Sequence, residues 1–390
     1  MDVDVAIVGA GPAGLCFARS LAGSGLSVAV VEKQPLEAIA EPGFDGREIA
    51  LTHASRAILQ RLGLWQRFDA DEVSLLRHAR VSNGEATAGL DVSAADGRSS
   101  QLGWLVPNHR IRRAAYELVA TQDNLRLLAG HGVTGVVHEG SRVALALEGG
   151  DVLRARMLVA ADSRFSQLRR MLGIGARSHD HGKRMLVCRV QVGEPHRHVA
   201  WEWFGYGQTL ALLPLNGDCA SVVLTLPPAE MAQVEALDEA AFGADLERRF
   251  RGRMGAIRPL GTRHVYPLVS VFADRFTAPR AALVGDAAVG MHPVTAHGFN
   301  LGLQGQDTLA KVVLDAHRRG DDIGAPEVLA RYGRRHRAAA WPMYAGTRLV
   351  VRVFTDDRPP LRAVRAALLR AVNRVPPLRR AIAGRLTQAG

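Results

Sequence analysis

The segment Gly9-Ala10-Gly11-Pro12-Ala13-Gly14 constrains the fold of this chain more than any other part of the sequence. It follows an apolar run and opens a helical pattern, and a second apolar run ends at Glu32. In such a strand–turn–helix–strand unit, the first glycine makes a tight turn, the second admits a pyrophosphate and the third lets helix and strand pack closely. The acid after the second strand holds a ribose hydroxyl. The pattern predicts a Rossmann-type dinucleotide site formed by Gly9, Gly11, Pro12, Ala13, Gly14, Glu32 and Lys33.

A second motif lies towards the other end of the chain and reads GDAAVGMHPVTAHGFN over residues 285–300. A strand-like run leads into it and a helical pattern follows it. Gly285 allows the chain to turn sharply off the strand, so that Asp286 presents its carboxylate to a sugar or polyol hydroxyl. N–H groups at the helix start, beside Gly298, attract negative charge through the helix dipole. Because the two motifs are far apart in sequence, we expect one binding domain built from discontinuous segments.

Between the two motifs the hydrophobic pattern changes. An apolar run first ends at Asp162-Ser163, again a strand followed by an acid. Four short, partly alternating runs follow, separated by turn residues, and together they predict an antiparallel sheet inserted into the binding domain. The most natural role of such a sheet is the wall of a substrate pocket. The expected strands are residues 185–192, 199–204, 209–215 and 220–226.

Three further segments look functional but are interpreted as structural. His179-Asp180-His181 and His196-Arg197-His198 lack a third carboxylate or thiolate at ligand spacing, so we expect no metal site. Trp201-Glu202-Trp203 lies in an expected strand and is interpreted as core packing.

Composition and charge limit the remaining possibilities. With 390 residues the chain exceeds one ordinary domain, and no apolar run approaches the roughly 20 residues that span a bilayer. The three cysteines are scattered, which favours reduced thiols in the cytoplasm. The net charge of +11 is concentrated at the end of the chain, where ten arginines face only Asp356 and Asp357.

This basic tail, residues 346–390, has apolar residues at helical spacing, and proline pairs divide it into short helices. Such a tail is expected to contact an anionic membrane surface or a partner protein, or alternatively to form a helical cap over the core. Membrane contact would place a cytoplasmic protein peripherally on the inner face of the membrane. Nucleic acid is not an expected partner, because no nucleic-acid motif accompanies the charge. The arginines are Arg348, Arg352, Arg358, Arg362, Arg365, Arg370, Arg374, Arg379, Arg380 and Arg385.

Taken together, the three motifs resemble those of the group A flavoprotein aromatic hydroxylases, which have the para-hydroxybenzoate hydroxylase fold. Within this group the chain looks most like the ubiquinone-biosynthesis hydroxylases of the UbiH, UbiF and UbiM types, over residues 3–344. The segment AAVGMHPVTAHG resembles the UbiM type, which hydroxylates 5-demethoxyubiquinol. The narrower resemblance also rests on the segments at residues 45–51, 62–65, 204–205, 210–215, 266–268 and 299–303.

The resemblance implies an α/β fold: a Rossmann-type FAD-binding domain, an inserted antiparallel-sheet substrate domain and a C-terminal helical tail. The FAD-binding domain is expected at residues 1–75, 105–182 and 275–345. The substrate domain is expected at residues 76–104 and 183–274, and the tail at residues 346–390.

The resemblance also implies a reaction, an electron donor and partners. Reduced FAD would react with O2 to give a C4a-hydroperoxide, which transfers oxygen to the ring of a polyprenylated quinol precursor. The electron donor would be NAD(P)H or an accessory reductase, and partners would include proteins of a ubiquinone-biosynthesis complex. Ser163 stands where the wider family has glycine, so we expect slow direct reduction by free NADH or NADPH. The alternatives are hydroxylation of a soluble aromatic, reduction of prenyl chains, or a non-catalytic, flavin-stabilised role in a biosynthetic assembly.

Finally, the resemblance assigns residues to FAD outside the glycine-rich turn. Pro293 would pack against the flavin ring, and His297 would tune flavin or substrate or simply donate one hydrogen bond; these two are the candidate catalytic residues. The N–H groups of Gly298, Phe299 and Asn300 would stabilise negative charge on the reduced flavin. The other expected FAD contacts are Arg47, Asn108, Arg112, Val133, Asp162, Gly285 and Asp286.

Overall fold

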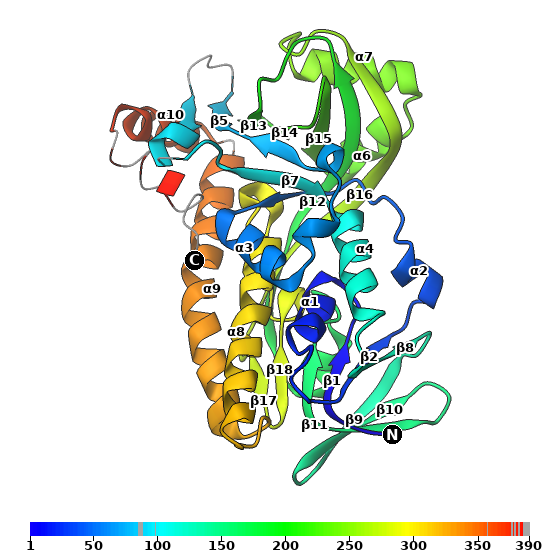
Figure 1. The fold of residues 1–390 in the computed structure, drawn as a ribbon. Helices are drawn as coiled ribbons and strands as arrows, with labels where there is room; N and C mark the ends of the chain where they lie inside the picture. The colour runs from blue at the N-terminus through cyan, green and yellow to red at the C-terminus, as the bar shows by residue number, and fades with distance from the viewer. Residues whose placement is uncertain are drawn as a thin grey trace.

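The computed structural model describes residues 1–84, 89–97, 99–356, 358–375, 377, 380 and 383–384. A mainly parallel sheet forms the base of the molecule in Figure 1, and a second, mixed sheet, also of eight strands, forms the opposite end. Helices α8 (Gly298–Arg318) and α9 (Pro326–Thr355) run along one side, from the base towards the second sheet. The expected α/β fold with an inserted sheet is confirmed.

The base sheet is centred on β1 (Asp2–Val8), which pairs in parallel with β2 (Val28–Glu32) and β11 (Val152–Ala160). Its middle residues are fully buried, as expected for a parallel strand covered by helices on both faces. The strand order is β17-β18-β11-β1-β2-β8, and the hairpin of β9 and β10 extends β11. The remaining strands are β8 (Leu125–Ala129), β9 (Val133–Glu139), β10 (Arg142–Leu147), β17 (Thr277–Ala278) and β18 (Ala281–Leu283).

The second sheet contains all four strands expected from the alternating pattern and has the order β19-β16-β12-β15-β14-β13-β5-β6. Its longest strands, β12 and β16, pair antiparallel, and β16 also pairs with β19, which belongs to the Gly-Asp motif. The sheet is therefore joined directly to the expected cofactor site. Its strands are β5 (His78–Asn83), β6 (Leu90–Ser93), β12 (Ala176–Val192), β13 (Val199–Phe204), β14 (Thr209–Pro214), β15 (Cys219–Leu226), β16 (Ile257–Ala273) and β19 (Val289–Gly290).

A small third sheet, β3-β7-β4, lies between these two parts, and the other helices cover the sheets. The small sheet consists of β3 (Glu48–Leu51), β4 (Ser74–Leu76) and β7 (Gly103–Pro107). The helices are α1 (Pro12–Ser20), α2 (Leu36–Ala40), α3 (His53–Leu62), α4 (Asn108–Val119), α5 (Gln167–Met171), α6 (Pro228–Glu235), α7 (Glu239–Arg249) and α10 (Pro359–Arg374).

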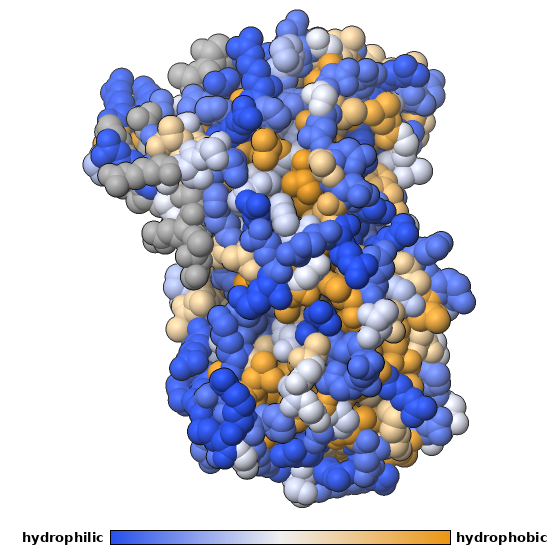
Figure 2. All heavy atoms as spheres, viewed as in Figure 1, coloured by the Kyte–Doolittle hydropathy of each residue, from blue (hydrophilic) through white to orange (hydrophobic). Residues whose placement is uncertain are grey.

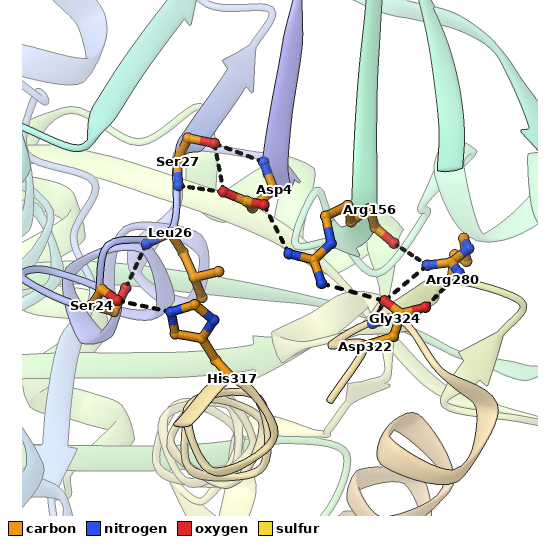
Figure 3. Close-up of polar contacts among 9 residues, drawn as sticks. All are labelled: Asp4, Ser24, Leu26, Ser27, Arg156, Arg280, His317, Asp322 and Gly324. Atoms are coloured by element: carbon orange, nitrogen blue, oxygen red, sulfur yellow. Dashed lines mark hydrogen bonds and ion pairs between the residues drawn. The ribbon is translucent and has the colours of Figure 1, made fainter. Parts of the chain in front are cut away.

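An ion-pair network fastens the α8–α9 connection to the base sheet (Figure 3). Arg156 on β11 donates to Asp4 on β1 at 3.1 Å, and its guanidinium lies 3.8 Å from Asp322. Arg280 donates to the same Asp322 carboxylate at 2.6 Å. These contacts lie towards the amino ends of the parallel strands, opposite the glycine-rich turn. The network therefore holds the helices in place without occupying the cofactor edge.

The tail is continuous with the rest of the chain. Four expected domain boundaries, at residues 75/76, 104/105, 182/183 and 345/346, fall inside β4, β7, β12 and α9, because these elements run from one part of the protein into the next. Helix α10 packs beside α9, β5 and β6 at the upper left of Figure 1. Arg365 of α10 is completely buried and donates to the Phe354 carbonyl at 2.7 Å. It therefore fastens the tail internally and is not available for docking; Arg379 and Arg385 lie outside the described residues.

Candidate functional site

The glycine-rich turn has the geometry that its sequence predicts. Gly9 has a φ of +109°, and a Cβ there would lie 2.4 Å from the Ala161 carbonyl oxygen. A Cβ on Gly14 would lie 2.0 Å from the Gly9 oxygen, whereas one on Gly11 would meet no described residue within 4 Å. Gly9 and Gly14 are therefore required for packing, and Gly11 leaves open space before the amino end of α1. That open cradle fits the pyrophosphate of a dinucleotide.

Glu32 lies at the end of β2, at the edge of this turn. Its carboxylate accepts hydrogen bonds from the N–H groups of Ala10 at 2.8 Å and Gln34 at 3.0 Å. The N–H of His131 donates to the Glu32 carbonyl at 3.0 Å, so the segment that leads to Val133 passes close by. The structure thus brings Glu32, Lys33 and Val133 to the same edge of the sheet.

Asp162 and Asp286 follow neighbouring parallel strands, β11 and β18, at the same edge. Asp162 Oδ1 is buried without a hydrogen-bond partner among the described residues, which fits a donor supplied by a ligand. Asp286 accepts hydrogen bonds from Arg164, at 2.8 Å from Nη2 and 3.1 Å from Nε. Arg164 also donates to the Val269 carbonyl at 3.0 Å. Arg164 was not predicted as a site residue, although its position directly after Asp162-Ser163 could have indicated it.

Ser163 closes the turn after β11. Its hydroxyl accepts from the Phe165 N–H at 3.1 Å, and its carbonyl accepts from the Ser166 N–H at 3.0 Å. Helix α5 begins only at Gln167, capped by the Ser166 side chain.

The amino end of α8 offers unpaired donors. The N–H groups of Gly298, Phe299 and Asn300 have no acceptor among the described residues. The Asn300 side chain is buried and satisfied: it donates to the Ala50 carbonyl at 2.8 Å and accepts from the Thr52 N–H at 3.1 Å. Its amide group therefore ties α8 to the start of α3, while its backbone N–H remains available to an anion.

The loop before α8 positions both candidate catalytic residues. Pro293 is exposed, as a ring-stacking residue should be. Burial lowers the pKa of His297, partly offset by the hydrogen bond between its Nδ1 and the Thr295 carbonyl. Burial and the neighbouring His181 lower the pKa of His292 to about 3. Both loop histidines are therefore neutral near pH 7.

Arg47, Asn108 and Arg112 lie around Asp45, which the sequence reading did not single out as a site residue. Asn108 donates to the Asp45 carboxylate at 2.7 Å, and Arg47 Nε donates to it at 3.1 Å. Burial would raise the pKa of Asp45, but these two donors outweigh it and lower the pKa. Tyr266 donates to the Asp45 carbonyl at 2.7 Å. The cluster presents polar groups at the junction of the base and the second sheet.

A cavity of about 210 Å³ lies between the second sheet and the loop before α8. The loop contributes Thr295 and His297, and β13 contributes Glu202, whose pKa burial raises to about 8. Most of the other lining is apolar. The face of the molecule seen in Figure 2 is mostly hydrophilic, with hydrophobic residues scattered between. The apolar lining includes Leu51, Leu76, Ala79, Val81, Leu102 and Leu213.

Neither histidine-rich segment forms a metal site in the part of the chain that the structure describes, where no three potential ligands converge. His181 instead stacks edge-on against His179 and His292 and hydrogen-bonds Ser270 at 2.8 Å. Over the same residues, no helix combines the length and hydrophobicity of a membrane span.

Comparison with known proteins gives three findings. Residues 2–347 match the family described as FAD binding domain. Ubiquinone hydroxylase UbiM of Neisseria meningitidis is 46% identical over 98% of this chain and 84% of its own length, and ubiquinone hydroxylase UbiL of Rhodospirillum rubrum is 36% identical over 97% and 87%. The crystal structure of p-nitrophenol 4-monooxygenase PnpA from Pseudomonas putida has a TM-score of 0.78 at 19% identity, covering 98% of this chain and 97% of that one.

Proposed function

This chain belongs to the FAD-binding-domain family, and we propose that it is an FAD-dependent monooxygenase that hydroxylates the ring of a polyprenylated quinol precursor of ubiquinone. The resemblance to ubiquinone hydroxylases and the expected FAD cofactor are confirmed by the family match and by the two relatives. The ring position, with 5-demethoxyubiquinol as our first candidate, is part of the proposal.

The observation that carries the proposal is the placement of the cavity. One of its walls is the loop whose Pro293 and α8 N–H groups are expected to contact the flavin, so a ring bound in the cavity would lie beside the cofactor. About 210 Å³ is less than a typical drug-sized pocket of roughly 300–1,000 Å³, which suits one substituted ring rather than a whole prenylated molecule.

The charge of the cavity favours a neutral ring. Arg80 is the one cationic side chain among the described lining residues, and it pairs with Asp91 at 2.6 Å. Glu202, whose pKa burial raises to about 8, offers a carboxylate no positive charge. A benzoate therefore has no unpaired cation to bind, whereas a phenol or quinol needs none.

The cofactor would be held by the residues already described. The cradle at Gly11 fits its pyrophosphate, Glu32 its ribose, and the buried, unpartnered oxygen of Asp162 fits a further donor. The amino end of α8 would stabilise negative charge on the reduced ring. When bound and reduced, FAD would activate O2, and one oxygen atom of that O2 would be transferred to the substrate. The protein's own task is to exclude water and orient the substrate ring.

Turnover of a short-chain demethoxyubiquinol by the FAD-loaded protein tests this function. With NADPH or a reductase present, we expect a product carrying one additional ring hydroxyl, identified by mass spectrometry and by comparison with synthetic isomers. A deletion strain should accumulate the corresponding quinone precursor. Turnover of soluble benzoates but not of the quinol would overturn the proposal.

We further propose that α10 docks on an anionic membrane surface and brings the cavity to its lipid-borne substrate. Val364, Leu368 and Val375 follow one another at helical spacing and are 50%, 46% and 40% exposed. Exposed Arg370 and Arg374 lie on the same helix, which gives the composition of an interfacial helix. Figure 2 shows hydrophilic residues over the outer surface of this region.

The inner face of α10 is linked to the cavity by one apolar cluster. Leu369 of α10 packs with Phe354 and Phe204, and the same cluster includes Val81 and Val294 of the cavity lining. A membrane contact at α10 would therefore lie against the wall of the substrate cavity.

Surface substitutions test this docking better than truncation, because removing α10 would uncover Phe204 and Phe354. Replacing Val364 and Leu368 together by Ser should reduce binding to vesicles of anionic lipid and leave FAD content unchanged. Replacement of Val137, 62% exposed on distant β9, by Ser is the matched control. Vesicle binding of the parent should also weaken with salt, since each basic residue near the surface contributes about 1 kcal/mol. Unchanged binding of the double variant would contradict the docking proposal.

A further inference from the structure

Glu202 occupies an unusual position for a carboxylic acid. Along β13 the indole rings of its neighbours Trp201 and Trp203 stack 5.5 Å apart on the opposite face of the sheet, although Trp201 also borders the cavity. That face is closed by Arg253, whose guanidinium lies 4.5 Å from the Trp203 ring. The alternation leaves Glu202 on the cavity face, beside Ala200 and opposite the loop before α8.

No group in the described chain satisfies the Glu202 carboxyl. It makes no hydrogen bond or ion pair with the described residues, although it is half-buried in a largely apolar cavity wall. The other ionisable lining groups are Arg80, engaged with Asp91 of β6, and His297, whose Nδ1 bonds the Thr295 carbonyl. A polar group that is partly withdrawn from water and has no partner is costly, so a carboxyl retained here points to a partner that comes with the ligand.

We propose that Glu202 hydrogen-bonds a ring hydroxyl of the substrate and thereby decides which ring carbon faces the loop at residues 293–298. The inference rests on the proposed function, because it assigns a residue to that same ring site. Glu202 is a positioning residue in this account: it touches the substrate but makes or breaks no covalent bond.

The protonation state agrees with this role. Burial raises the pKa of Glu202 to about 8, so the neutral acid predominates at pH 7. A neutral carboxyl both donates to and accepts from a hydroxyl, as a quinol ring requires. Above pH 8 the donor is lost and a charge appears in an apolar cavity, so binding should weaken.

Equilibrium binding to the FAD-loaded protein provides the test, with 2-prenylphenol and its methyl ether, 2-prenylanisole, as probes. Binding is followed by the change in the visible spectrum of bound FAD. The parent should prefer the phenol by roughly tenfold, the worth of one hydrogen bond. Glu202→Ala should abolish that preference, and Glu202→Gln should keep it while removing the weakening above pH about 8. Glu235→Gln, an exposed glutamate on α6, is the matched control and should behave as the parent.

Equal affinity of the parent for phenol and ether would overturn the proposal, as would a Glu202→Ala variant that keeps the preference. The parent comparison needs no variant, so the test survives if Glu202→Ala loses its FAD. It also needs no turnover. A protein that prefers the phenol but hydroxylates no quinol precursor would refute the proposed function and leave the assignment of Glu202 standing. In an active enzyme, Glu202→Ala should also yield a mixture of ring positions; a single unchanged product would count against the proposal.

Discussion

Replacing Gly11 by Ala should separate cofactor binding from folding. Gly11 has φ −75° and ψ 175°, a conformation open to any residue, and its added Cβ would meet no atom of the described residues within 4 Å. The substitution restricts the unfolded chain, which stabilises by about 0.4–1 kcal/mol, but alanine is a poorer helix N-cap than glycine by a similar amount. The stability of the FAD-free protein should therefore change by less than about 0.5 kcal/mol.

The substitution should weaken FAD binding much more than it changes the stability of the FAD-free protein. The methyl group would occupy the space that the pyrophosphate needs against the backbone, and overpacking of this kind typically costs about 1–3 kcal/mol. That corresponds to FAD binding weakened roughly 5- to 150-fold. Urea unfolding of the FAD-free protein gives the first quantity, and recovery of free-FAD fluorescence on dilution gives the second.

Two other glycines provide controls. Gly14→Ala should fail to fold, because its Cβ would lie 2.0 Å from a backbone oxygen. Gly346→Ala, at an exposed position of α9 with open space around it, should gain about 1 kcal/mol of stability without affecting FAD. If Gly11→Ala bound FAD as tightly as the parent, the pyrophosphate would not lie against Gly11.

Three further changes follow from the site. Asp286→Ala removes the carboxylate that Arg164 holds, and FAD binding should weaken by about 1.5–3 kcal/mol; full FAD occupancy at dilutions where the parent dissociates would remove Asp286 from the site. Ala296→Gly should raise the unfolding free energy by about 1 kcal/mol, because Ala296 has a left-handed φ of 52°; an unchanged urea midpoint would contradict this. The pKa of Glu202 is raised from 4.5 to about 8 in the folded state, so its stabilising contribution is complete below pH 4.5 and is lost as pH rises to about 8. Relative to the parent, Glu202→Gln should therefore gain stability over this interval, by at most about 1.4 kcal/mol per pH unit, and a constant difference between the two urea midpoints would refute the shift.

Features encoded by local pattern were predictable from the sequence. The glycine-rich turn, the strand ending at Glu32 and the helix after Gly298 depend on backbone conformation and hydrophobic periodicity within a few residues. The four strands of the inserted sheet followed in the same way, from alternation and turn residues. Such patterns act over short distances, so the sequence alone determines them.

The contacts between residues far apart in the sequence depend on the tertiary structure. Arg164 reaches Asp286 across 122 positions in the sequence, and Glu202 faces a cavity whose other wall is nearly 100 residues further along. Arg365 belongs to a basic helix that the pattern presents as a docking surface, yet it is buried against backbone carbonyls of the preceding turn. The sequence pattern around a charged residue does not show whether its side chain faces solvent, a partner or a cavity. Only the packing of distant elements removes it from water, as it does for Arg365 and for the carboxyl of Glu202, to which we assign a substrate contact.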